Sequence, residues 1–422
     1  MNLNQLAWRN IWRRKRRTMI TAFSIAFGVL LSVTFTGSGD YTYTNMIDMG
    51  ASMGMGHVTV EPVGYRLKPT LDKRLTNTPE LRQKITAMQD VADATVRITG
   101  QAMFASARKS VGGAFIAVDP AFETEANNLL IRSMVEGELF SDKRGRGIVI
   151  GSKLAQKLHV KIGKKVVYTT TDANGEIISD IARVSGIFTT GIDMVDGAMA
   201  LLPIGSVQQT LDYSSDEATL IAVIIRDQRH AESMRDTIAN LSKTTASETA
   251  PSEANDIAVL TWKESQPDLA GVIAFDKAGN YISQFLVGLL IAVGILNTML
   301  MSVLERTREF GVMMAVGMSP KTLFRLVMVE SFWMAIVGLI LGILITAPWY
   351  YYLYHTGIDF SGSFGSDFSY GGVIVDPVFK ARLFKESIIA ILSGVFLLAL
   401  LAGLYPAWRA GRVPPVESLK TI

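Results

Sequence analysis

The chain has 422 residues, of which 49% are hydrophobic and only 19% are charged. Its mean hydropathy of +0.28 is high for a soluble protein, so some segments must be far more apolar than the average. The formal net charge of +3 is too small to indicate a nucleic-acid partner. The sequence has no cysteine, which excludes disulfides and thiolate metal sites, and its four scattered histidines do not predict a zinc site.

The first 17 residues are strongly basic. No acidic residue precedes Asp40, and the segment contains six basic ones: Arg9, Arg13, Arg14, Lys15, Arg16 and Arg17. This asymmetry places the segment in the cytoplasm. Trp8 and Trp12 would share one face of a helix, which is typical of a helix lying at the membrane surface. The segment is also explained simply as a basic flank that sets topology.

Four long uncharged runs follow along the chain. Each is at least 22 residues long, enough to cross a bilayer as a helix: Thr18–Gly39, Ala278–Leu304, Ser331–Tyr354 and Ser387–Trp408. The first lacks a small-residue cleavage pattern and is interpreted as an uncleaved anchor. We therefore predict transmembrane helices over residues 18–39, 278–304, 323–354 and 387–408. The connection 305–322 and the tail 409–422 carry basic residues, which agrees with a cytoplasmic location for both. The loop 355–386 would then lie outside, and its basic residues argue mildly against this orientation.

A large extracytoplasmic domain is predicted between the first two spans, over residues 40–277. Alternating runs at 57–61, 166–170 and 221–225 predict strands, and Asn174–Gly175 predicts a hairpin turn. Helical patterns cover 79–89, 152–158 and 230–241. This irregular mixture predicts an α+β domain, and the composition of 242–256 predicts a flexible connector or an exposed loop. The fold class is thus a four-helix membrane protein carrying an inserted α+β domain.

No ATPase site is found in the sequence, because the pattern G-x-x-x-x-G-K-[ST] is absent. The connection after the second span is more informative. It is charged and compact, and Gly317 can end a helix while Ser319 and Pro320 can begin the next one. We expect the second span to continue into a short charged helix at the cytoplasmic surface. By itself, this pattern also fits a solvated connector.

The segment from Asn297 to Lys321 resembles the coupling region of the MacB/LolC/LolE/FtsX-type ABC permeases. Further similarities lie in Leu6–Asn10, in Gly147–Ala155 with Ile162–Val166, and in the closing motifs Tyr405–Ala410 and Pro415–Leu419. They follow the family's order along nearly the whole chain. The resemblance favours a coupling helix over a solvated connector.

The resemblance implies a non-enzymatic permease in a bacterial inner membrane, with both termini in the cytoplasm and the large domain in the periplasm. It also implies two subunits of a cytoplasmic ABC ATPase, which bind ATP and Mg²⁺, and a second permease, identical or related. Seven residues are the predicted ATPase-coupling set: Glu305, Arg306, Thr307, Arg308, Glu309, Gly311 and Gly317. No cofactor is expected in this chain.

Glu330 is the ionisable residue of the third span, and such residues are functional candidates. A structural role is the alternative, with Glu330 paired to Arg325 or to the coupling segment. Two small-residue pairs, Gly338 with Gly342 and Ser24 with Gly28, would permit close helix packing.

The cargo is predicted from similarity to the LolC/LolE branch, which extracts lipoproteins from the membrane for a periplasmic carrier. Four methionines above the first span could then contact acyl chains, although packing explains them equally well: Met46, Met49, Met53 and Met55. The hairpin at Asp172–Glu176 looks too short to be that branch's carrier-recruiting hook. Two alternatives are a MacB-type efflux permease for peptides or drugs and an FtsX-like regulator that transmits force to a periplasmic enzyme.

Overall fold

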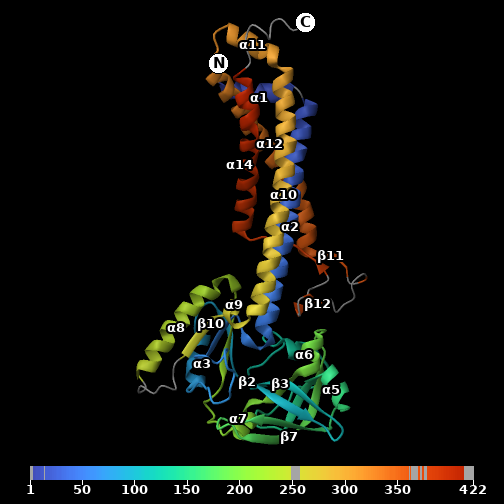
Figure 1. Cartoon of the computed structure of the whole chain (residues 1–422), viewed down its shortest axis with the longest axis vertical. Coiled ribbons are helices and arrows are strands. Elements are labelled where there is room, and N and C mark those ends of the chain that lie inside the picture. The colour runs from blue at the N-terminus through green and yellow to red at the C-terminus, as the bar shows by residue number, and fades with distance from the viewer. Residues whose placement is uncertain are drawn as a thin grey trace. The chain divides into compact units, whose positions relative to one another are not determined.

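The structure, a computed structural model, describes residues 3–13, 15–248, 257–360, 362, 369–370, 373–374 and 378–412. The chain divides into two compact units (Figure 1). The helical unit comprises Met1–Thr42, Phe275–Phe360 and Val378–Ile422, and the second unit comprises Tyr43–Ala274 with Ser361–Pro377. We call the second unit the inserted domain. The closing motif at 415–419 lies outside the described residues.

Within the described residues, four helices are long and apolar enough to cross a membrane, in agreement with the predicted number of spans. They are α2 (Lys15–Gly50), α10 (Pro267–Glu305), α12 (Pro320–His355) and α14 (Lys385–Ala410). Each predicted span lies within one of these helices. Helices α2 and α10 extend well beyond the uncharged runs, because charged residues such as Asp40 end an apolar run without ending a helix.

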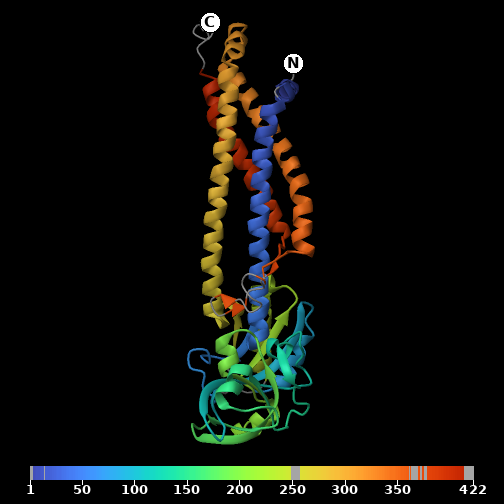
Figure 2. The ribbon, with the colours of Figure 1, turned by 90° about the vertical axis from the view of Figure 1, so that its right-hand side faces the viewer.

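Helices of the helical unit run side by side (Figure 2), and glycines allow some of them to approach closely. A Cβ at Gly338 of α12 would lie 2.7 Å from the Ile25 side chain of α2, and one at Gly342 would lie 3.0 Å from Val29. A Cβ at Gly28 of α2 would lie 2.1 Å from Ile291 of α10. The small-residue pairs therefore pack α2 against α12 and α10.

Two short helices complete the helical unit, α1 (Leu3–Arg13) and α11 (Thr307–Ala315). They share one apolar cluster with α10, α12 and α14, in which Ile11, Phe310 and Leu323 are buried. After α12, β11 (Ile358–Asp359) pairs with β14 (Val378–Phe379). In the inserted domain, β12 (Ser369–Tyr370) pairs with β13 (Val373–Ile374).

The inserted domain is built on one sheet of ten strands among the described residues. Its strands are β1 (Val58–Pro62), β2 (Val91–Ala105), β3 (Ser110–Val118), β4 (Met134–Gly137), β5 (Gly147–Gly151), β6 (Lys165–Thr171), β7 (Ile177–Phe188), β8 (Met199–Pro203), β9 (Leu220–Ile225) and β10 (Ile257–Thr261). Their order is β10-β1-β9-β2-β3-β8-β5-β7-β4, and β6 pairs with both β2 and β7. These pairings close β2, β3, β8, β5, β7 and β6 into a ring.

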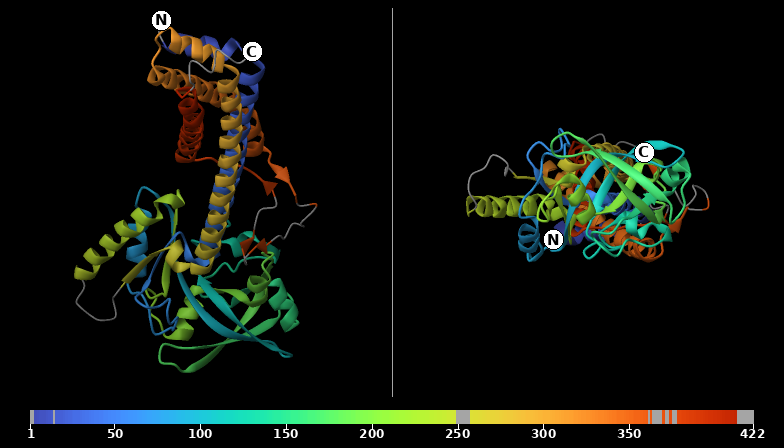
Figure 3. Two further views of the ribbon diagram at one scale, coloured as in Figure 1. Left: turned by 45° about the horizontal axis from the view of Figure 1, so that its top comes forward. Right: turned by 90° about the horizontal axis from the view of Figure 1, so that it is seen from below.

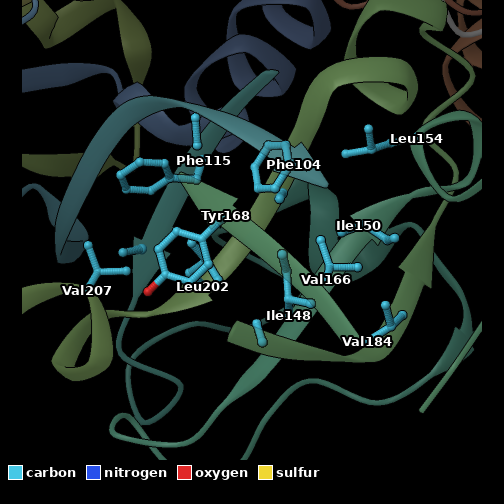
Figure 4. Packing of buried hydrophobic residues seen from close by; sticks show 14 of the residues in the cluster. Phe104, Phe115, Ile148, Ile150, Leu154, Val166, Tyr168, Val184, Leu202 and Val207 are labelled. Carbon is cyan, nitrogen blue, oxygen red and sulfur yellow. The ribbon is translucent and has the colours of Figure 1, made fainter. Parts of the chain in front are cut away.

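The ring encloses an apolar core, seen in Figure 4. The aromatic side chains of Phe104, Phe115 and Tyr168 lie there with branched aliphatic residues such as Ile150 and Val184, all buried. Alternation along β6 explains the placement, because Val166 and Tyr168 point inward while Lys165 and Thr171 are exposed. The predicted hairpin is confirmed, since β6 and β7 pair from Lys165–Arg183 to Thr171–Ile177.

Helices cover the sheet elsewhere in the domain. They are η1 (Ala51–Met55), α3 (Thr78–Thr86), α4 (Leu129–Arg132), α5 (Ser152–Leu158), α6 (Asp193–Ala198), α7 (Ile204–Leu211), η2 (Gln228–His230), α8 (Ala231–Glu248) and α9 (Trp262–Ser265). Met234 and Ile238 of α8 are buried with Val58 and Val60 of β1, and Figure 3 shows α8 beside β10. Because α8 continues to Glu248, the predicted connector 242–256 is wrong for 242–248, and 249–256 lie outside the described residues.

Candidate coupling site

The turn between α10 and α12 is formed by residues whose local preferences agree with their positions. Gly317 has φ of +104°, a conformation that favours glycine, and it follows the end of α11. The Ser319 hydroxyl accepts a hydrogen bond from the Thr322 N–H, and Pro320 occupies the first turn of α12. These three predicted roles are confirmed. The expected continuation of the span helix is wrong, because the helix is broken at Arg306, whose φ and ψ are −102° and 11°.

Helix α11 has one exposed and one buried side. Arg308 and Glu309 are exposed, and so are Val312 and Val316, which retain 46% and 84% of their accessible surface. Phe310 on the other side is completely buried. Arg308, Glu309 and Val312 of α11, together with Val316 directly after the helix, form a surface that a protein partner could cover.

The seven predicted coupling residues therefore differ in their exposure. Glu305, Arg308, Glu309 and Gly317 are exposed, whereas Arg306 and Gly311 are buried; Thr307 is half-buried. The Thr307 hydroxyl donates a hydrogen bond of 2.5 Å to the Leu304 carbonyl oxygen at the break. Sequence spacing could not separate these groups, because the break at Arg306 changes the face that each residue presents.

Arg306 points away from the exposed surface toward Glu330 of α12. Its Nη1 donates to both carboxylate oxygens of Glu330, each at 2.9 Å, and its Nε donates to Glu309 at 3.1 Å. The guanidinium also lies 4.9 Å from the centre of the Phe310 ring. Only 9% of each side chain in the Arg306–Glu330 pair is exposed. The predicted pairing of Glu330 with the coupling segment matches this geometry, whereas Arg325 is exposed.

Helix α1 supplies a third member that the sequence analysis missed. The Asn10 side-chain amide donates a hydrogen bond of 2.7 Å to Oε1 of Glu330. Ala7 and Ile11 on the same side of α1 are buried, and the rings of Trp8 and Trp333 of α12 lie 5.1 Å apart. The sequence offered one indication of this contact, the position of Asn10. It lies three residues after Ala7 and therefore shares the buried face of α1.

Further polar contacts surround this group. Arg17 of α2 pairs with Glu305 at the end of α10, and the Thr18 hydroxyl donates 2.6 Å to the Ile11 carbonyl oxygen. A cavity of about 40 Å³ lies among Asn10, Arg17, Arg306 and other polar residues. The ends of α1, α2, α10 and α12 thus meet in one charged, hydrogen-bonded cluster.

The four candidate cargo methionines do not form one exposed group. Met46 is 4% exposed and packs in the inserted domain's apolar cluster, while Met49, Met53 and Met55 are half-buried. Nη2 of Arg66 donates a hydrogen bond of 3.5 Å to the Met55 sulfur and another of 3.5 Å to Oε2 of Glu61. Burial raises the pKa of the Glu61 carboxyl, although Arg66 acts to lower it. Packing accounts for Met46, and cargo contact stays a prediction for the other three.

A different apolar surface in the inserted domain was missed by the sequence analysis. A groove of about 800 Å³ is lined by residues of β2, β3, β6, β7 and α6. Met103, Ile177 and Met194 on its walls are 48%, 79% and 78% exposed. These residues are far apart in the sequence, and only the closed ring of strands brings them together. Within the described residues, no group of three His, Asp or Glu side chains could hold a metal.

Two family models match the chain. Residues 18–241, more than half of the chain, match the MacB-like periplasmic core domain. Residues 281–415 match the FtsX-like permease C-terminal domain, which contains α11 and both partners of the Arg306–Glu330 pair.

Individual relatives agree with these matches. A lipoprotein-releasing system transmembrane protein LolC from Xylella fastidiosa is 23% identical over 69% of this chain and 69% of its own length. A macrolide export ATP-binding/permease protein MacB from Shewanella oneidensis is 25% identical over 96% of this chain and 58% of its own length. An uncharacterised ABC transporter permease from Methanocaldococcus jannaschii is 24% identical over 98% of this chain and 96% of its own length. The chain belongs to the MacB/LolC/LolE-type family of ABC transporter permeases.

Proposed function

We propose that this permease couples ATP hydrolysis by a separate ATPase subunit to movements of its inserted domain. Through these movements it extracts lipoproteins or lipids from the inner membrane. The ATPase binds ATP and Mg²⁺, and docks on the exposed side of α11. The observation that carries the proposal is the two-sided character of α11. Its exposed side offers charged and apolar groups, while Phe310 on its buried side packs into the apolar cluster of the helical unit and Arg306, just before its start, binds Glu330 of α12.

The orientation follows from the distribution of charge. The basic residues before α2 and those of residues 305–322 flank the same end of the helical unit, where α1 and α11 share an apolar cluster. We assign this end to the cytoplasm and the inserted domain to the periplasm, because basic flanks are retained on the cytoplasmic side. Both chain termini are then cytoplasmic, and the docking side of α11 faces the compartment that contains ATP.

A second permease, identical or related, completes the proposed complex. Helix α10 leaves a long apolar surface uncovered in the single chain, with Phe275, Tyr281 and Phe285 each at least 70% exposed. In a membrane this surface meets either lipid or another permease. Two permeases would present two α11 helices to two ATPase subunits.

Lipoprotein or lipid cargo is favoured by the relative named as a lipoprotein-releasing protein, which this chain matches over similar fractions of both lengths. The groove containing Met103 and Met194 adds an apolar surface that could hold an acyl chain. Because the β6–β7 turn at Asp172–Glu176 is short, recruitment of any periplasmic carrier would belong to the second permease.

The main alternative is efflux of peptides or drugs, and one relative of this chain is named a macrolide export protein. A force-transmitting regulator of a periplasmic enzyme is the third possibility.

Site-directed photocrosslinking tests the docking proposal. Because the chain has no cysteine, a single Cys can carry the crosslinker without background labelling. Val316→Cys, directly after α11, and Met194→Cys in the inserted domain are matched, at 84% and 78% exposure. We expect the first alone to capture a nucleotide-binding ABC subunit in native membranes. Capture from both positions, or from neither in a complex with measurable ATPase activity, would contradict docking at α11.

The same strategy tests the cargo. Crosslinkers at Met53→Cys and Met194→Cys should capture acylated protein or lipid in the nucleotide-free complex, and mass spectrometry identifies the adduct. The exposed charged position Arg308→Cys is the control and should capture neither. Adducts with soluble peptides or small exported compounds would support the efflux alternative, whereas adducts only within the permease would support packing.

A further inference from the structure

Arg306, Glu330 and Asn10 form a hydrogen-bonded group in which Arg306 and Glu330 are buried and Asn10 is half-buried. The three residues come from the α10–α11 break, from α12 and from α1. Arg306 and Glu330 are each 7% exposed as whole residues. We call this group the Arg306 triad.

The guanidinium of Arg306 is shared between two carboxylates on different helices. One nitrogen, Nη1, contacts both oxygens of Glu330 on α12, while Nε contacts Glu309 on α11. Asn10 then donates to the Glu330 oxygen Oε1, which Arg306 also contacts. Charged hydrogen bonds of this kind are short and directional, whereas apolar contacts tolerate sliding. The triad therefore restricts the orientation of α11 against α12 more tightly than the contacts of Phe310 can.

The position of Arg306 in the backbone gives this restriction a direction. Arg306 lies between the last residue of α10 and the first residue of α11. Its carbonyl oxygen accepts a hydrogen bond from the Phe310 N–H at 2.9 Å. Holding its side chain against α12 fixes the direction in which α11 leaves α10. A displacement of α11 then pulls on Glu330 and, through Asn10, on α1.

We propose that the Arg306 triad is a positioning device that sets the angle of α11 and passes displacements of that helix to α12 and α1. The inference deepens the proposed function, because it rests on α11 being the surface that the ATPase moves. Arg306, Glu330 and Asn10 are positioning residues here, and the ATPase contacts others, such as Arg308.

Distance measurements between spin labels test the geometry without any partner. Val316→Cys, directly after α11, and Ile340→Cys on α12, both exposed, provide two label sites in the cysteine-free full chain. We expect one narrow distance distribution in nanodiscs. Glu330→Gln should broaden it, because the isosteric amide removes the ion pair, and Asn10→Ala should broaden it less. An unchanged distribution in Glu330→Gln would overturn the inference.

A double variant separates positioning from simple stability. Arg306→Met with Glu330→Leu removes both charges and fills similar volume, a change that usually preserves stability. We expect a folded permease with a broad label distribution and about tenfold weaker stimulation of the bound ATPase, within the usual range of coupling between sites. Normal stimulation in this variant would show that the triad serves stability alone. The conservative Arg306→Lys keeps the charge but loses the fork, and should lie between wild type and the double variant.

The control is Glu123→Gln, which alters another buried Arg–Glu pair in the inserted domain. It should leave the label distribution narrow, and a broad one would mean that any loss of a buried ion pair disturbs the labels. Failure of the docking proposal can be distinguished from failure of the positioning role. If Arg308→Ala leaves ATPase binding and stimulation normal while Glu330→Gln broadens the distribution, docking at α11 is wrong and the positioning role stands.

Discussion

Among the residues that the structure describes, two buried Arg–Glu pairs have nearly the same composition, one in each unit. In the inserted domain, Arg97 donates from Nε and Nη2 to the two oxygens of Glu123, at 2.7 and 2.8 Å. In the helical unit, Arg306 donates to Glu330. Each glutamate also accepts a hydrogen bond from an asparagine side chain, Asn128 in the first and Asn10 in the second.

The two pairs differ in what they connect. Arg97 on β2 holds Glu123, which lies in the loop between β3 and α4, and the Asn128 side chain also caps α4. All three belong to a single domain and lie within 32 positions of the chain. Arg306, by contrast, joins helices that separate segments of the chain supply, and its guanidinium is divided between Glu330 and Glu309. The first pair stabilises one loop, whereas the second relates one helix to others.

The largest expected effect is on the pair of the inserted domain. Glu123→Ala would leave Arg97 charged and completely buried, which costs about 3–5 kcal/mol. Glu330→Ala should cost less, because Glu309 remains beside Arg306. Thermal unfolding and trypsin digestion of the full chain in detergent measure both. Equal losses would show that Glu309 does not compensate.

Apolar replacement of both partners sharpens the difference. Arg97→Met with Glu123→Leu should restore stability to within about 2 kcal/mol of wild type and leave ATPase stimulation normal. The corresponding change at Arg306 and Glu330 should restore stability without restoring stimulation. Parallel unfolding and ATPase assays compare the two double variants, and the same outcome in both would remove the functional distinction.

Two glycines allow a comparison with smaller effects. Gly317 after α11 and Gly175 in the β6–β7 turn have φ of +104° and +85°, and neither would place a Cβ within 4 Å of another group. Alanine at either position should therefore cost about 1 kcal/mol through backbone strain alone. Only Gly317→Ala should alter ATPase stimulation, because only that turn adjoins α11. Reduced stimulation in Gly175→Ala would argue against this assignment.

The smallest effect is expected for an exposed pair of the inserted domain, Asp227 with Arg229. The Arg229 hydrogen bond lowers the pKa of Asp227 to about 2 from 3.8. Because the folded-state pKa is depressed, the stabilisation is present above about pH 4 and is lost as the pH falls toward 2. Solvent screens this pair, so Asp227→Asn should change stability by less than about 1 kcal/mol at neutral pH. Unfolding curves at pH 7 and pH 3 check this, and a larger effect at pH 3 would contradict the sign.

Much of the helical unit could be predicted from the sequence. Four uncharged runs predicted four spans, and Gly317, Ser319 and Pro320 predicted the end of one helix and the start of the next. These features are local, because hydrophobic length and backbone preference act within a few residues. The hairpin at Asn174–Gly175 was predictable for the same reason.

The tertiary structure decided which charged residues are buried and what they contact. Glu305, Arg306, Arg308 and Glu309 are adjacent in the sequence and equally polar, yet Arg306 alone is buried. The helix break turns it toward Glu330, and α1 brings Asn10 to the same carboxylate. Likewise, the closed ring of strands creates the groove at Met103 and Met194, whereas Met46 enters a core. Sequence by itself determined the spans, the turns and the charged segment between α10 and α12. Only packing between distant segments determined the Arg306 triad, because burial and pairing depend on neighbours that chain order does not supply.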